Sequence, residues 1–190
     1  SGYSYWEYFR YYRRELKGAN LLGAKGFEFN NPRLVSGARA NDQDPLCFFE
    51  EGDTDASKII YDQYAYEGEG YLKHGYNSGQ YSVLTSQKLF YIENGSYDFS
   101  AYIISSGGQE IASLVALDKN GKVIKSKDIE NTDNKWTLIT LSDIQVTDNF
   151  CQVGIMSKSG PKGWLYADEL NFSLNEGGGG EYNKKEYFHF

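Results

Sequence analysis

Residues 94–117 constrain the fold most, because they contain two long segments with the pattern of β-strands. In residues 96–105 one side of the predicted strand is apolar and consists of Tyr97, Phe99, Ala101 and Ile103. A period of two is typical of a strand with one buried face. Residues 109–117 are apolar on both sides, which is typical of a strand inside a sheet or facing a second layer. We therefore expect a β-protein built around these strands, with turns at Asn94-Gly95 and Gly107-Gly108.

Most of the remaining chain also carries strand patterns, and only residues 3–17 predict a helix. The other expected strands are residues 20–29, 46–51, 57–62, 70–74, 81–91, 123–128, 135–141, 150–157 and 164–174. Turn residues such as Asn120-Gly121 separate them, and no helical pattern intervenes. Many short strands in one chain predict an all-β fold: an antiparallel β-sandwich of jelly-roll type, preceded by a short N-terminal helix.

The length and charge of the chain limit its organisation and partners. A chain of 190 residues is long enough for one well-buried domain with appendages. We expect an aromatic helix or linker at residues 1–18, the β-sandwich at residues 19–175, and a Gly-rich linker with a tail at residues 176–190. The net charge of −7 argues against nucleic acid as a partner, and no apolar run is long enough to predict a membrane span.

No catalytic signature stands out in the sequence. There is no Gly-rich phosphate loop, no Gly-x-Ser-x-Gly segment and no paired-histidine metal motif. Cys47 and Cys151 lie in apolar segments, which is typical of small buried side chains, and their spacing indicates no disulfide. Acidic pairs are abundant in this acidic chain, so a small glycan lyase or hydrolase stays open as an alternative.

Two carboxylates form a candidate calcium site. Asp168 is in register with Leu170 and Phe172, so we expect it on the core side of the last strand. Glu28 lies near the start of the sandwich, and the first and last strands of a jelly roll can be neighbours. Two carboxylates with backbone carbonyls suit Ca²⁺, which takes about 6–8 oxygen ligands, and a buried carboxylate without a partner is costly. The alternative is that Asp168 caps a turn and Glu28 is solvated.

A set of aromatic and polar side chains recurs along the predicted strands. The set comprises Tyr71, Lys73, His74, Tyr76, Asn77, Gln80, Tyr81, Gln87, Tyr102, Gln109 and Trp164. An aromatic face packs against the C–H patch of a sugar ring, while amide and amino groups bond its hydroxyls. Taken singly, each tyrosine is more simply read as an ordinary sheet aromatic. As a group, these residues predict an exposed aromatic platform.

Several segments of the chain together carry a family resemblance. They are GFE (26–28), EGDTDAS (51–57), GYLKHGY (70–76), YSVLTSQ (81–87), NGSYDFSAYIISSGGQ (94–109), WTLITLSDIQVT (136–147), CQVGIMS (151–157) and GWLYADEL (163–170). In this order they resemble the galactan-binding carbohydrate-binding modules of family 61, which accompany bacterial endo-β-1,4-galactanases. The resemblance covers about residues 20–174. It departs from the family pattern at Cys47-Phe48 and at Gly75-Tyr76, where the family has tryptophan.

The resemblance implies a non-catalytic module that binds a β-linked polysaccharide, most directly β-1,4-galactan of plant cell walls. It also implies a secreted or cell-surface bacterial protein in which the module is joined to a glycoside hydrolase domain. Related sandwiches carry structural Ca²⁺ near the first and last strands, which adds weight to Glu28 and Asp168. The sugar-binding residues that it implies are Lys73, His74, Tyr76, Asn77, Gln109 and Trp164, with stacking on Tyr76 and Trp164.

A structural or adhesion module that binds a protein partner is the main alternative. Aromatic residues crowd nearly all round the predicted helix at residues 3–17, which a solitary surface helix would not favour. The tail at residues 182–190 is aromatic again. Two such ends could meet in a contact between domains or between copies.

Overall fold

The computed structural model describes residues 19–23, 25–27, 47–76 and 78–175, and within these ranges the regular structure is almost entirely β. The strands are β1 (Phe49–Gly52), β2 (Ser57–Tyr61), β3 (Gly70–His74), β4 (Tyr81–Phe90), β5 (Gly95–Ser105), β6 (Ile111–Leu117), β7 (Val123–Asp128), β8 (Thr137–Val146), β9 (Phe150–Ser159) and β10 (Leu165–Leu174). A 3₁₀ turn, η3 (Thr54–Ala56), precedes β2. The predicted helix at residues 3–17 lies outside the described residues.

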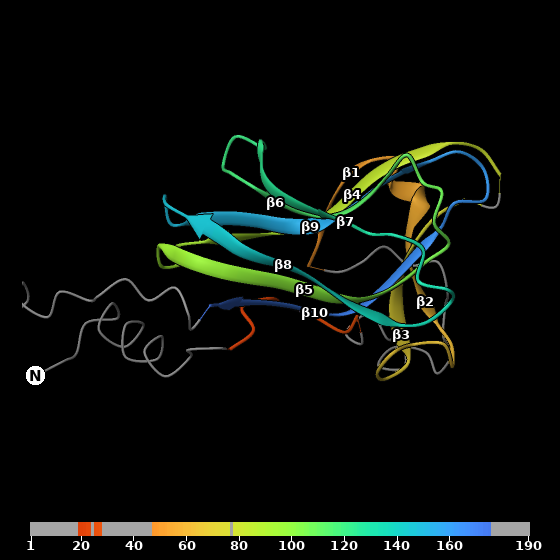
Figure 1. Ribbon diagram of the computed structural model, residues 1–190, viewed down its shortest axis with the longest axis horizontal. Helices are drawn as coiled ribbons and strands as arrows, with labels where there is room; N and C mark the ends of the chain where they lie inside the picture. The colour runs from red at the N-terminus through yellow and green to blue at the C-terminus, as the bar shows by residue number, and fades with distance from the viewer. Residues whose placement is uncertain (1–18, 24, 28–46, 77, 176–190) are drawn as a thin grey trace, which may run out of the picture.

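The strands form two antiparallel sheets that pack face to face, seen as two layers in Figure 1. The first sheet has the order β1-β4-β9-β6-β7 and the second has the order β2-β3-β10-β5-β8. The prediction of an antiparallel β-sandwich is therefore confirmed. No helix long and apolar enough to span a membrane occurs in the described ranges.

The core lies between the two sheets and follows the alternation seen in the sequence. The side chains of β5 that point inward are Tyr97, Phe99, Ala101 and Ile103, and each is at most 2% exposed. Tyr97 stacks on Phe172 of the neighbouring strand β10, with 4.8 Å between ring centroids. β6 lies between β9 and β7, as expected for a strand that is apolar on both sides. Burial of each large apolar side chain stabilises the fold by about 1.5–3 kcal/mol.

The connections around β5 differ from a simple hairpin arrangement. β4 and β6 belong to one sheet and β5 to the other, so Asn94-Gly95 and Gly107-Gly108 join strands of different sheets. Gly107 and Gly108 both have positive φ, at +68° and +74°, which explains why glycine occupies this link. Among the described strands, consecutive neighbours pair only in β2–β3 and β6–β7, the latter through the predicted Asn120-Gly121 turn. Local turn signals predict a reversal but not the sheet that receives the next strand.

The strand predicted at residues 20–29 is not formed in its described part. The Asn20 side chain takes over the hydrogen bonds that a strand would make with β10. Its Oδ1 accepts from the backbone N–H groups of Leu22 and Phe172, at 3.1 and 3.0 Å, and its Nδ2 donates to the carbonyl of Leu170 at 2.7 Å. The predicted neighbourhood of the first and last segments is nevertheless correct, because Leu21 N–H donates to Phe172 O at 2.8 Å.

The two cysteines differ in environment, and both are free thiols. Cys151 is fully buried, as predicted, and burial raises the pKa of its thiol to about 12. Cys47 is exposed, so the prediction of burial is wrong for this residue. Cys47 lies two residues before the edge strand β1, and the next residue, Phe48, packs against the core and stacks on Phe27.

Candidate functional site

Six aromatic side chains contact one another on the outer surface of the second sheet. We call this set the aromatic face; its members are Tyr66, Tyr71, Tyr102, Trp136, Trp164 and Tyr166. Tyr71, Tyr102 and Tyr166 alternate along β3, β5 and β10 with residues of the core, so they point away from it. Trp164 precedes Tyr166 by two residues and shares its side of the strand. The class of surface predicted from the sequence, an aromatic platform on a sheet, is thus present.

The rings of the aromatic face follow one another in a continuous row. Centroid distances along the row are 4.5 Å for Trp164–Tyr166, 4.9 Å for Tyr166–Tyr71, 6.1 Å for Tyr71–Trp136, 6.1 Å for Trp136–Tyr66 and 3.6 Å for Tyr66–Tyr102. Tyr71 is only 3% exposed and supports the others, whereas Tyr66 is 42% exposed. The remaining four rings are half-buried, so each offers part of its surface to solvent. The planes of neighbouring rings differ by 14° to 79°, so the row offers both ring faces and ring edges to a sugar chain.

The loop between β2 and β3 carries Tyr66 over the sheet, and Asp168 fastens it there. Asp168 is completely buried. Its Oδ2 accepts the backbone N–H groups of Tyr66 and Glu67 at 2.9 and 3.1 Å, and its Oδ1 accepts that of Glu169 at 2.7 Å. Burial raises the pKa of this carboxyl to about 7, and the three amide hydrogen bonds act in the opposite direction. The carboxylate therefore fixes the position of one end of the aromatic face.

Two further hydrogen bonds hold the same loop. The indole Nε1 of Trp136 donates to the carbonyl of Tyr64 at 2.8 Å, and the hydroxyl of Tyr71 donates to Asp62 Oδ2 at 3.0 Å. Burial, assisted by the negative charge of Asp62, raises the pKa of Tyr71. The phenol consequently keeps its proton and its role as a donor. Loop and sheet thus form one prearranged surface.

The surroundings of Asp168 allow a test of the calcium prediction. The segment next to Glu28 lies beside Asp168, because a Cβ atom added to Gly26 would lie 2.5 Å from Glu169 Oε1 and 3.8 Å from Asp168 Oδ1. Glu28 itself lies outside the described residues. Among the residues that the structure describes, no group of three or more His, Cys, Asp or Glu side chains could hold a metal ion. The amide donors already satisfy Asp168, so the described residues alone do not form a calcium site, and Ca²⁺ at Glu28 and Asp168 stays a prediction.

His74 does not reach the surface, which corrects its predicted role in sugar binding. The side chain is completely buried between the sheets. Its Nδ1 lies 2.9 Å from Ser157 Oγ, and its Nε2 lies 2.9 Å from Thr85 Oγ1. Burial lowers the pKa of His74 to about 3, so the ring is neutral and both nitrogens have partners. Its position in β3 points inward with Leu72, whereas Lys73 points outward.

Gln109 and Tyr76 contact other protein groups near Trp164. The Gln109 amide donates to the carbonyl of Trp164 at 2.8 Å and to Ser105 Oγ at 3.2 Å. Tyr76 packs edge-to-face on Tyr81, with 5.9 Å between centroids, and belongs to a small apolar cluster outside the aromatic face. The described geometry therefore gives Gln109 a positioning role. Tyr76 contacts Tyr81, not a ring of the aromatic face, and its contact with sugar stays a prediction.

Of the remaining predicted residues, Lys73 and Trp164 lie on the aromatic side of the sheet. Lys73 is half-buried and pairs across strands with Tyr166. Asn77 lies outside the described residues. Sequence reasoning missed Tyr66, Trp136 and Tyr166. The two-residue spacing from Trp164 was a signal for Tyr166, whereas a loop residue such as Tyr66 has no periodicity that could reveal its position.

We expect Gln109→Ala to weaken glycan binding through Trp164 rather than through a lost sugar contact. Removal of the amide takes one donor from the Trp164 carbonyl, which keeps the N–H and the hydroxyl of Ser106. A lost hydrogen bond of this kind costs about 1 kcal/mol. The measurement is tryptophan fluorescence beside isothermal titration with galactan oligosaccharides. A changed emission spectrum without ligand is the expected sign of displacement. Weakened binding with an unchanged spectrum would contradict the positioning role.

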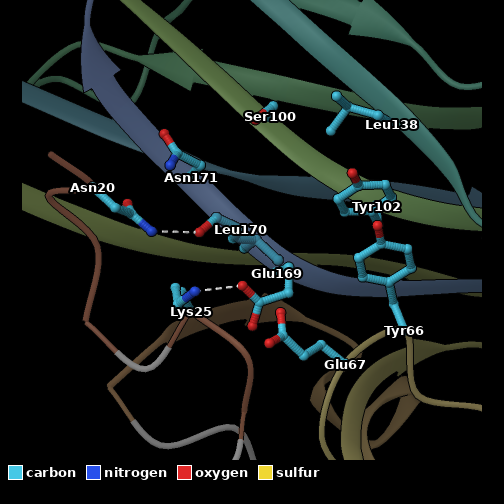
Figure 2. A pocket seen from close by; sticks show the side chains of 10 residues that line it. All are labelled: Asn20, Lys25, Tyr66, Glu67, Ser100, Tyr102, Leu138, Glu169, Leu170 and Asn171. Atoms are coloured by element: carbon cyan, nitrogen blue, oxygen red, sulfur yellow. Dashed lines mark hydrogen bonds and ion pairs between the residues drawn. The ribbon is translucent and has the colours of Figure 1, made fainter. Parts of the chain in front are cut away.

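A pocket opens beside the last two rings of the row (Figure 2). It has a volume of about 420 Å³ and is lined by Asn20, Lys25, Tyr66, Glu67, Ser100, Tyr102, Leu138, Glu169, Leu170 and Asn171. A β-bulge interrupts the pairing of β10 with β5 between Asp168 and Asn171, and Glu169 within it has a positive φ of +47°. Bulges redirect side chains, and this one turns Glu169 towards the pocket.

Comparison with known proteins supports the class of fold. No family profile matches the chain, and no curated protein matches it. Among solved structures, TmCBM61 in complex with β-1,4-galactotriose is similar with a TM-score of 0.65 and 18% identity, over 82% of this chain and 99% of that one. The resemblance to galactan-binding modules is therefore confirmed at the level of the fold.

Two larger proteins contain a similar sandwich. The enzymatically active domain of tailspike protein 4 from bacteriophage CBA120 matches with a TM-score of 0.58 and 13% identity, over 82% of this chain and 21% of that one. An arabinose-bound α-L-arabinofuranosidase, MgGH51, matches with a TM-score of 0.53 and 14% identity, over 82% of this chain and 26% of that one. The matching part makes up about a quarter or less of each of these two larger chains.

Proposed function

We propose that this chain is a non-catalytic carbohydrate-binding module for a β-linked polysaccharide, most directly β-1,4-galactan. The observation that carries the proposal is the row of six contacting aromatic rings on the outer surface of a sheet. The fold shared with a module that was solved with β-1,4-galactotriose supports the choice of ligand. Lys73 pairs across strands with Tyr166, which supports a role for its ammonium group as a hydrogen-bond donor to sugar hydroxyls.

We further propose that the module belongs to a secreted or cell-surface protein with a glycoside hydrolase domain in the same polypeptide. A module of this kind would hold the catalytic domain on its polymer. Single modules gain little net free energy from each polar contact, because water competes for the same groups. We therefore expect dissociation constants of roughly micromolar to millimolar.

The first test is affinity electrophoresis of the chain in gels that contain β-1,4-galactan, xylan, β-glucan, mannan or arabinan. Retention by galactan above all supports the proposal as stated. Retention by another polymer keeps the class of module and replaces the ligand. A folded protein that no polymer retains would overturn the proposal and favour the protein-binding alternative.

We expect Trp164→Ala to lower galactan affinity at least tenfold without unfolding the protein. Trp164 is half-buried at one end of the row and packs on Tyr166, so the substitution removes a stacking surface and spares the core. Isothermal titration measures the affinity, and thermal unfolding checks the fold. The matched control is Tyr91→Ala, since Tyr91 is 76% exposed and lies outside the aromatic face. Equal losses in both variants would show that the aromatic face is not the binding surface.

A further inference from the structure

We propose that the pocket beside Tyr66 and Tyr102 binds a terminal residue of a neutral glycan, either the end of a chain or the tip of a branch. The inference rests on the proposed function and adds the part of the glycan that is recognised. Tyr66 and Tyr102 are the last two rings of the row and also form a wall of the pocket. A glycan stacked along the row therefore delivers its next sugar into the pocket.

The side of the pocket opposite the two tyrosines is bounded by the N-terminal segment. Figure 2 shows Asn20 and Lys25 facing Tyr66 and Tyr102 across the pocket. Asn20 is bonded to the Leu170 carbonyl, and Lys25 Nζ lies 2.5 Å from Glu169 Oε2. These contacts join the N-terminal segment to β10, so a glycan that continued in this direction would meet the N-terminal segment. The volume of about 420 Å³ falls within the range of about 300–1,000 Å³ that is typical of small-molecule sites.

The pocket also offers polar groups that no described residue uses. Ser100 and Asn171 are directly opposite each other on β5 and β10, and both line the pocket. Neither side chain has a hydrogen-bond partner among the described residues, and both are half-buried. A sugar that lies in the pocket beside the stacked rings of Tyr66 and Tyr102 would have its hydroxyls within the reach of a hydroxyl and an amide, which both donate and accept. This combination of an aromatic wall and free polar groups matches a pyranose or furanose ring.

The charges around the pocket favour a neutral sugar. Glu67 and Glu169 contribute two carboxylates, and Lys25 contributes one ammonium group that is already paired with Glu169. The Glu169 partner raises the pKa of Lys25, so this pair stays ionised. One negative charge is left over, and it repels the carboxylate of a uronic acid. Carboxylates accept hydrogen bonds from neutral hydroxyls, so the same charges are compatible with a hexose or pentose.

The test uses the whole chain and β-1,4-galactotriose in isothermal titration. Ser100→Leu, which fills the pocket, is expected to lower the affinity at least tenfold. Ser126→Leu makes the same chemical change on the exposed strand β7 of the other sheet and is expected to change nothing. If Ser100→Leu unfolds, the smaller substitution Asn171→Ala tests the same pocket in its place. Wild-type protein that binds no glycan would defeat the proposed function itself, whereas normal binding by both pocket variants would overturn the pocket assignment alone.

Competition experiments separate the sources of the terminal sugar. Long linear galactan, the same mass cleaved to oligosaccharides, and galactan with single-sugar branches compete for the immobilised chain. Terminal recognition predicts that the cleaved polymer competes at least tenfold better per unit mass than the long one, and equal competition overturns it. If the branched polymer competes as well as the cleaved polymer, the pocket binds branch tips. If it competes less well, the pocket binds chain ends. Trigalacturonate is expected to bind at least tenfold more weakly than galactotriose, and equal binding overturns the preference for neutral sugars.

Discussion

Asp168→Ala is expected to lower the free energy of unfolding by about 3 kcal/mol or more and to abolish galactan retention. The substitution leaves the backbone N–H groups of Tyr66, Glu67 and Glu169 without their acceptor. Each unsatisfied buried donor costs about 1–3 kcal/mol, partly relieved where the freed loop admits water. Because the same hydrogen bonds hold Tyr66 over the sheet, loss of stability and loss of binding should occur together.

Denaturant unfolding and affinity electrophoresis measure the two effects. Asp62→Ala is the matched control, since Asp62 belongs to the same loop and accepts single hydrogen bonds from Tyr64 N–H and the Tyr71 hydroxyl. We expect the control to cost about 1 kcal/mol for each lost bond. An Asp168→Ala variant as stable as the control would contradict the role of Asp168 as the anchor of the loop.

A chelator added to the same samples tests the calcium prediction. If Ca²⁺ binds at Glu28 and Asp168, EDTA lowers the melting temperature of the wild-type protein and has no further effect on Asp168→Ala. An ion that binds only the folded state stabilises that state, so the melting temperature must fall when free Ca²⁺ is removed. A wild-type melting temperature that is the same with calcium and with EDTA would reject the ion and leave the anchoring role intact.

The second large effect is a contribution of His74 to stability that is lost in acid, and the raised pKa of Asp168 acts in the opposite direction over much of the same pH range. Burial lowers the pKa of His74 to about 3 in the folded protein, against about 6.5 in the unfolded chain. Between these values the unfolded chain binds a proton that the folded protein does not, so stability is complete above about pH 6.5 and falls as the pH decreases. The contribution of this one group is about 1.4 kcal/mol for each pH unit over that window.

The matching variant is His74→Gln, which does not titrate and can bond both Ser157 and Thr85 through its amide. We expect the stability of the wild-type protein relative to that of His74→Gln to fall as the pH decreases from 6.5 to 4, measured by urea unfolding at each pH, because Asp168 contributes equally to both proteins. Galactan affinity at pH 7 should be unchanged, because His74 is completely buried. Parallel pH profiles for the two proteins would show that another group causes the acid sensitivity, and a lost affinity would restore a direct role for His74.

The sequence predicted only part of the candidate site. Trp164 and Lys73 were expected in the site and lie on its surface, while Gln109 was expected to bond sugar and instead bonds the Trp164 carbonyl. An amide can serve either purpose, and its partner depends on which backbone groups the fold brings near. Tyr66 was missed because this loop residue reaches the sheet through contacts with distant residues, among them its hydrogen bond to Asp168, 102 positions later in the chain.

What the sequence determined by itself is the local part of the structure: the alternation in β5, the apolar character of β6 and the all-β class. These follow from the period of two, because each side chain of a strand necessarily faces the opposite way from its neighbour. Only the tertiary structure decided that β4 and β6 lie in the sheet opposite β5, that His74 is enclosed while Lys73 is half-buried on the outer side, and that the loop carrying Tyr66 completes the aromatic face. The reason is that sheet membership and enclosure depend on contacts between distant segments, which no local pattern of residues contains.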